Sequence, residues 1–306
     1  DPSKFLRHVD AWNAAFPNFS TWGVDASIWQ DKGMLPLDAI ALSINAAKWG
    51  IQTLLSSGQT LNEAASRCTI RLASTTDIIS TAAAIRGLRV AFATMIEELG
   101  CDPESTPLWI ESRTTSIYGV SDIIEDNLLR HALMAYGAVL GGADGIEVRR
   151  HDFISPSEDD TVASEQAIRW SRNIQHILRD EAMLGRTDDP MGGSHHLDSA
   201  TRWYATESLS RSKDMTSIKE WNDATLRGRA VWLSAPVFVP QGSKRGEEAL
   251  SENPEDLFYL LHHSSVEKTN PPPTSNSSDK LYSGKSAAPS EIKTVETAEG
   301  IEIPIS

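Results

Sequence analysis

The chain contains little cysteine, few basic residues and no long apolar segment. Only two of its 306 residues are cysteines, Cys68 and Cys101, and two thiols cannot form a disulfide framework in a chain of this size. We therefore expect reduced thiols and a location in the cytoplasm or an organelle matrix, with the cytoplasm preferred. No apolar run approaches the roughly 18 residues of a membrane span, and the first residues lack the apolar core of a signal peptide. Since the chain also begins without Met, we expect a processed, trimmed or partial sequence.

Acidic residues outnumber basic ones. The 42 Asp and Glu against 28 Lys and Arg give a formal charge of −14, while apolar residues make up 40% of the chain. This apolar content is that of an ordinary globular protein, and the negative charge repels nucleic acids and anionic lipid surfaces. We therefore expect one large domain or two small ones, with neither a nucleic-acid nor a membrane partner.

Short β-branched or aromatic runs alternate with long amphipathic segments between about residues 18 and 212, which predicts β/α units and a parallel sheet. The strands are expected at 19–26, 68–73, 108–111 and 145–148. Their helices are expected at 37–55, 76–99, 122–140 and 161–184. A weaker fifth strand is expected at 194–198, followed by a helix that ends near residue 212. Four or five units make half of an eight-stranded barrel or most of an open doubly wound sheet, and the pattern alone does not separate the two.

The composition changes near residue 240. Three consecutive prolines at 271–273 and a Ser/Asn run through Ser278 mark a linker with few apolar residues. We expect a β/α region over 1–240 and a low-complexity tail over 241–306, with a short helix at 254–262 and a strand at 297–305 that could dock on the sheet.

Three short motifs suggest ligand sites, and in each case a structural interpretation is preferred. His195 and His196 are adjacent on an expected strand, so their side chains should point to opposite faces and not reach one metal ion. Gly192-Gly193-Ser194 could hold an anion with its N–H groups, but such a run is more often a tight turn. The segment 242–246 lacks the Gly-Lys-Ser/Thr ending of a phosphate loop. We expect no metal site and no nucleotide-driven enzyme.

Polar residues near the ends of the third and fourth expected strands are the better candidates. Arg113 and Thr114 follow the third strand, where parallel sheets place their functional loops, and could bind a carboxylate or phosphate. The alternative is a solvated Arg in a turn. Glu147 points away from its apolar neighbours in the fourth strand, and if buried it would need a basic partner such as Arg71, Arg113 or Arg149.

Two blocks with matching spacing resemble methylmalonyl-CoA mutases. The chain reads Ser-Arg-Asn-Ile-Gln at 171–175 and Asp-Pro-Met-Gly-Gly-Ser-His-His at 189–196, where the family carries Ala-Arg-Asn-x-Gln and Asp-Pro-x-Gly-Gly-Ser-Tyr-Tyr. The stretches 24–33 and 138–144 also agree, and they are most similar to the small, or β, subunit of the bacterial heterodimeric enzyme. The resemblance covers about residues 1–212, which correspond to the second half of the family's barrel.

The resemblance implies a TIM (β/α)8-type barrel that is partial or rearranged. In the family, acyl-CoA lies along the barrel axis, and a separate C-terminal domain supplies cobalamin with a His ligand from an Asp-x-His-x-x-Gly motif that is absent here. Only Arg113 and Thr114 match the substrate-gripping loop of the catalytic subunit, Glu147 stands where that subunit has a His, and the paired tyrosines are His195 and His196. Residues 297–303 look like the segment with which family barrels begin, either as a rearranged strand or as a chance match.

These departures predict a structural, small-subunit-like component of an adenosylcobalamin-dependent acyl-CoA mutase. The complex would be an isomerase, an intramolecular transferase interconverting methylmalonyl-CoA and succinyl-CoA. Its cobalamin and its chemistry would come from a catalytic or cobalamin-binding partner subunit. The alternative is an acyl-CoA-binding subunit that becomes catalytic with a separate cobalamin subunit; Arg113 and Thr114 would then hold substrate, and Glu147 or His195 would act at the carbonyl. A third reading is a binding module whose tail docks on a partner.

Overall fold

Four parallel strands form the central sheet of the computed structural model, which describes residues 2–16, 19–119, 123–153, 165–234, 293–296 and 302–305. The strands are β1 (Trp22–Asp25), β2 (Cys68–Ser74), β3 (Trp109–Thr114) and β4 (Gly145–Glu147), and each pairs with the next in sequence order. A doubly wound sheet reverses its strand order, whereas a β/α barrel does not. The order therefore agrees with half of a barrel, and the described residues do not form a closed one.

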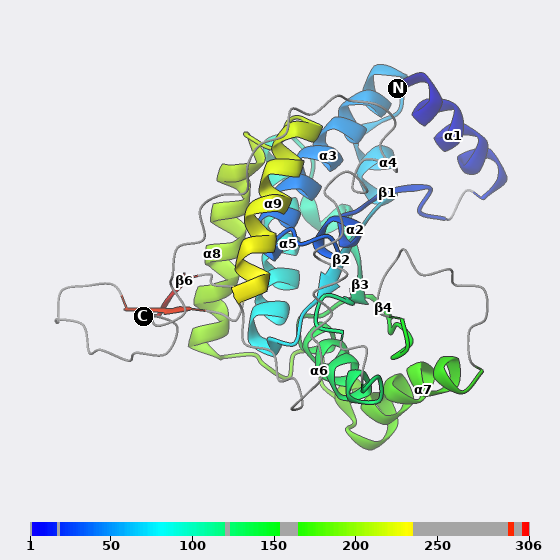
Figure 1. The fold of residues 1–306 in the computed structure, drawn as a ribbon. Helices are drawn as coiled ribbons and strands as arrows, with labels where there is room; N and C mark the ends of the chain where they lie inside the picture. The colour runs from blue at the N-terminus through cyan, green and yellow to red at the C-terminus, as the bar shows by residue number, and fades with distance from the viewer. Residues whose placement is uncertain are drawn as a thin grey trace.

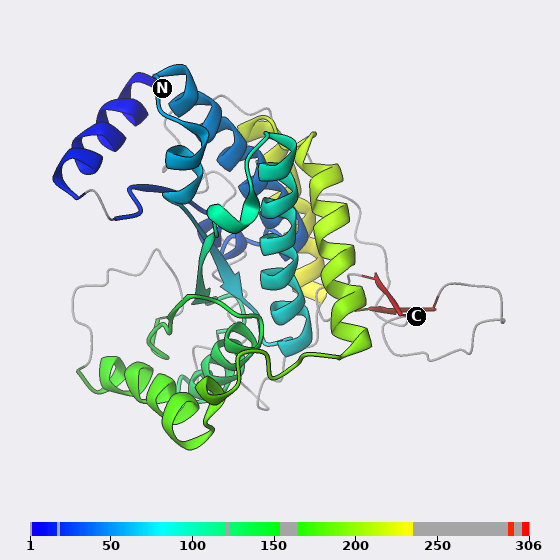
Figure 2. The ribbon, with the colours of Figure 1, turned by 180° about the vertical axis from the view of Figure 1, so that it is seen from behind.

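Helices cover one side of this sheet (Figure 1). The long helices are α1 (Pro2–Ala15), α3 (Pro36–Ser56), α5 (Ile78–Glu98), α6 (Asp126–Leu140), α7 (Glu165–His176), α8 (His195–Ser212) and α9 (Ile218–Ser234). Two short helices, α2 (Ser27–Gln30) and α4 (Leu61–Ser66), follow β1 and precede β2. Viewed from behind, α5 and α8 run side by side along the sheet, and they contact each other directly (Figure 2).

Local sequence signals explain where the core helices begin and end. Pro36 starts α3 at the first helical position, where its missing N–H costs nothing, and Gly58 just beyond the helix adopts a φ of +97°. Asp77 caps α5 by accepting a hydrogen bond from the backbone N–H of Ser80, and Gly100 follows the helix with a φ of +90°. The sequence predicted both helices to within two residues.

The two faces of the sheet differ in character. Side chains alternate along a strand, so Cys68, Ile70 and Leu72 of β2 all enter the apolar core beneath the helices. Thr69 and Arg71 point to the opposite face, where both are only partly buried, and we call this face the open face. Burial raises the pKa of the Cys68 thiol, and both cysteines are free.

Helix α5 is long and apolar enough to cross a membrane by length and composition alone. However, 61% of its most apolar window is buried, and the helix packs against α3, α6 and α8. These contacts are those of a core helix in a folded domain.

The expected fifth strand at 194–198 is wrong. Ser194 instead caps α8 by accepting a hydrogen bond from the backbone N–H of Leu197, and the preceding Gly193 turns the chain with a φ of +83°. A turn and a cap explain the Gly-Gly-Ser run. Helices α1, α4 and α9 were not expected, and the helix expected at 161–184 is divided into α7 and a π-helical turn (Ile177–Glu181).

Most of the tail, for which the sequence predicts a helix and a strand, lies outside the described residues. The helix predicted at 254–262 lies outside the described residues. A strand β6 (Glu302–Ile305) does form within the range 297–305, but it pairs with β5 (Lys293–Glu296) in an antiparallel sheet of its own. Strand β6 lies next to α8 and does not pair with an edge of the four-stranded sheet.

Candidate functional site

A layer of charged side chains crosses the open face from β1 to β4. Asp25 of β1 aligns with Arg71 of β2, and Arg71 aligns with Glu111 of β3. Glu147 of β4 lies two residues beyond Gly145, which is the β4 residue that aligns with Glu111. Nε of Arg71 donates to Glu111 Oε2 at 2.8 Å, and Nη1 lies 3.5 Å from Asp25 Oδ2 and 3.8 Å from Glu147 Oε2. The guanidinium of Arg71 therefore interacts with three carboxylates.

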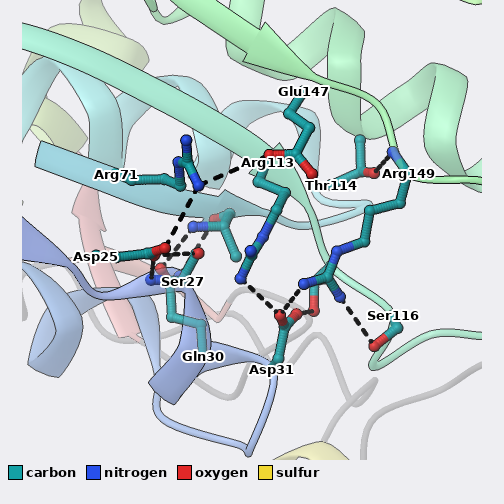
Figure 3. A network of polar contacts seen from close by, with 12 residues as sticks. Asp25, Ser27, Gln30, Asp31, Arg71, Arg113, Thr114, Ser116, Glu147 and Arg149 are labelled. Atoms are coloured by element: carbon teal, nitrogen blue, oxygen red, sulfur yellow. Dashed lines mark hydrogen bonds and ion pairs between the residues drawn. The ribbon is translucent and has the colours of Figure 1, made fainter. Parts of the chain in front are cut away.

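A second, buried cluster lies where the strands end (Figure 3). Asp31 Oδ2 accepts from Nη2 of Arg113 at 3.1 Å and from Nη2 of Arg149 at 2.6 Å, while Oδ1 accepts from the hydroxyl of Thr115 at 2.8 Å. The side chain of Asp31 is 3% exposed, against 12% for Arg113 and 11% for Arg149. This cluster joins the chain segments that follow β1, β3 and β4.

The turn that carries Asp31 is fixed by its neighbour Gln30. The buried amide of Gln30 donates to the carbonyl of Ala73 at 3.1 Å and accepts from the N–H of Ala73 at 2.7 Å. These two bonds extend the pairing of β1 with β2 beyond the end of β1. As a result, Asp31 is held above the ends of the strands.

Helices α6 and α7 hold the segment that carries Arg149. The backbone N–H of Arg149 donates to the hydroxyl of Thr114, and the hydroxyl of Ser171 donates to the Arg149 carbonyl at 3.0 Å. Asn127 of α6 donates to the His151 carbonyl at 3.0 Å. Ser171 belongs to the Ser-Arg-Asn-x-Gln motif, so this motif contributes to the position of Arg149.

Two buried histidines lie beside the same segment. Burial lowers the pKa of His131 to about 4, and the positive charge of Arg149 together with His151 adds to this effect. A hydrogen bond with the Arg150 backbone opposes the shift only in part. The ring of His151 packs against Trp170 of α7 with a centroid distance of 5.1 Å.

In the buried cluster two guanidinium groups share the carboxylate of Asp31, and Glu147 also acts electrostatically on Arg149. Burial lowers the pKa of Arg149, and Asp31 acts in the opposite direction. Nε of Arg113 is buried and has no hydrogen-bond partner among the described residues. The arrangement can thus accept one more anionic or hydrogen-bond-accepting group.

Helix α9 packs on the loops that follow β1 and β3. Trp232 meets Tyr118 edge to face with ring centroids 5.3 Å apart, and Trp221 meets Trp29 in the same way at 5.6 Å. Gly228 passes so close to the Gly33 carbonyl oxygen that a Cβ there would lie only 2.0 Å away. The end of the sheet that carries the buried cluster is therefore partly covered by α9.

The structure brings together three of the four residues proposed from the sequence. Arg113 pairs in register with Glu147, and Thr114 supports Arg149, so all three lie at the ends of β3 and β4. Glu147 is on the open face, and among the suggested partners it approaches Arg71. His195 lies in the exposed first turn of α8, outside both charged groups.

Sequence reasoning missed Asp31. It lies in a turn after a four-residue helix, where neither strand nor helix periodicity gives a signal. The only available indication was its place within the stretch 24–33, which resembles the mutase family.

The open face does not suit cobalamin. Coordination of cobalt from the protein requires a soft or imidazole ligand, and the described strand residues on this face are Gly23, Asp25, Thr69, Arg71, Ala73, Trp109, Glu111, Arg113, Gly145 and Glu147. None is His, Cys or Met. The described residues also contain no group of three or more potential metal ligands.

Comparison with known proteins identifies the chain's relatives. The sequence model for methylmalonyl-CoA mutase matches residues 5–218. The chain is 31% identical over 178 residues to the probable methylmalonyl-CoA mutase small subunit of Mycobacterium tuberculosis, a match covering 58% of this chain and 29% of that protein. It is 26% identical over 208 residues to the small subunit from Propionibacterium freudenreichii, covering 66% and 31%.

A large subunit is also among the relatives. The 2-hydroxyisobutanoyl-CoA mutase large subunit of Aquincola tertiaricarbonis is 26% identical over 176 residues, covering 57% of this chain and 30% of that protein. The chain thus spans about a third of the length of these curated relatives. The expected family and the small-subunit resemblance are both confirmed.

Proposed function

Because the chain belongs to the methylmalonyl-CoA mutase family, we propose that it is a non-catalytic, small-subunit-like component of an adenosylcobalamin-dependent acyl-CoA mutase in the cytoplasm. The complex would be an isomerase that interconverts methylmalonyl-CoA and succinyl-CoA. A catalytic subunit would hold the cobalamin and perform the rearrangement. This chain would contribute its β/α region, residues 1–240, to the assembly, with 241–306 as a tail.

The charge of the open face carries the non-catalytic part of the proposal. In the family this face would line the axis along which acyl-CoA lies, and acyl-CoA is an anion with several phosphate charges. Here the strand residues of this face carry three carboxylates, Asp25, Glu111 and Glu147, and two cations, Arg71 and Arg113. The net negative charge repels an anionic ligand, and the long side chains of Arg71 and Trp109 occupy space that the ligand would need.

Mutase turnover with methylmalonyl-CoA and adenosylcobalamin tests this proposal. The assay compares the full chain alone, the large subunit of the P. freudenreichii enzyme alone, and the two mixed and co-purified. We expect turnover only where the large subunit is present, together with co-elution of the two chains. Turnover by this chain alone, or failure to co-elute, would contradict the proposal.

The buried Nε of Arg113, which has no hydrogen-bond partner among the described residues, favours one alternative, an acyl-CoA-binding subunit that is catalytic with a separate cobalamin subunit. In that case Arg113 would hold the carboxylate of the acyl group. Replacing Arg113 with Ala should then raise the dissociation constant for methylmalonyl-CoA about 10-fold to 100-fold, the usual loss for a charge-assisted hydrogen bond. Calorimetric titration measures this change.

A matched substitution shows whether such a loss is specific. Arg172 is exposed on α7, so Arg172→Ala removes an equal charge at a distance from the cluster and should leave the dissociation constant within about twofold. Equal binding by the Arg113→Ala and Arg172→Ala variants would rule the alternative out.

A further inference from the structure

We draw no further inference here: the strongest candidate, the surface patch of exposed aromatic side chains on and just after helix α1 (Trp12, Phe16 and Phe19), carries none, because nothing in the described part of the structure shows what covers it.

Discussion

Replacing Asp31 with Asn is expected to lower the free energy of unfolding by about 3–5 kcal/mol, the usual cost of removing one partner from a buried ion pair. Asn occupies nearly the same volume, so little packing is lost. The charge, however, disappears, and the buried guanidinium groups of Arg113 and Arg149 lose the carboxylate to which both donate. Chemical denaturation at neutral pH measures the loss.

The same substitution at an exposed site is the control. Asp189 also pairs with an arginine, Arg86, at 2.9 Å, but its side chain is 46% exposed. Water replaces a lost exposed ion pair, so Asp189→Asn should cost no more than about 1 kcal/mol. Equal losses at Asp31 and Asp189 would contradict the view that the buried cluster stabilises the fold through its charge.

A double variant measures how strongly Asp31 and Arg149 are coupled. If stranded positive charge is the cause, adding Arg149→Gln to Asp31→Asn removes one of the two stranded cations. The double variant should then be more stable than the sum of the two single losses predicts, with a coupling of about 1–3 kcal/mol. Strict additivity would contradict an energetic coupling between Asp31 and Arg149.

Acid is expected to destabilise this protein through His131. Its pKa is about 4 in the folded chain, below the ordinary value of 6.5, so between these values the unfolded chain binds more protons than the folded one. Stability is therefore complete above about pH 6.5 and falls as the pH drops toward 4. A shift of this size corresponds to a loss of about 3 kcal/mol, at about 1.4 kcal/mol per pKa unit.

Substituting the histidine removes this dependence. His131→Gln keeps a hydrogen-bonding side chain without a proton to gain, so its unfolding free energy should decrease less between pH 7 and pH 4 than that of the wild type. His195→Gln, at an exposed position in the first turn of α8, should keep the wild-type pH profile. Parallel profiles for wild type and His131→Gln would show that His131 is not the responsible group.

The parts of the fold that the sequence predicted are those with long, regular patterns. In the strands β1 to β4 apolar residues recur about every two positions, and in helices α3, α5 and α6 about every three and a half, because one face of each element is buried. The expected strand at 194–198 failed because five residues that include two histidines have no reliable period, and the cap at Ser194 was the stronger local signal.

The candidate site was predicted only in part, for a related reason. Arg113, Thr114 and Glu147 lie on or beside strands, so the alternation along β3 and β4 indicated where their side chains point. Asp31 lies in a turn, and its partners are far away in the sequence. No local pattern encodes such a contact, and only the assembled sheet brings the three charged groups together.

The Asp31 contacts also bear on how the chain folds. Arg113 is 82 residues from Asp31 in the sequence, and Arg149 is 118 residues away. Contacts of such high sequence separation form only after the intervening loops have closed, and they therefore slow folding. The segments after β1, β3 and β4 share one carboxylate, so loss of the segment after β1, which carries Asp31, would leave both guanidinium groups without that partner. The successive β/α units should consequently unfold together in one cooperative transition and not one after another from an end.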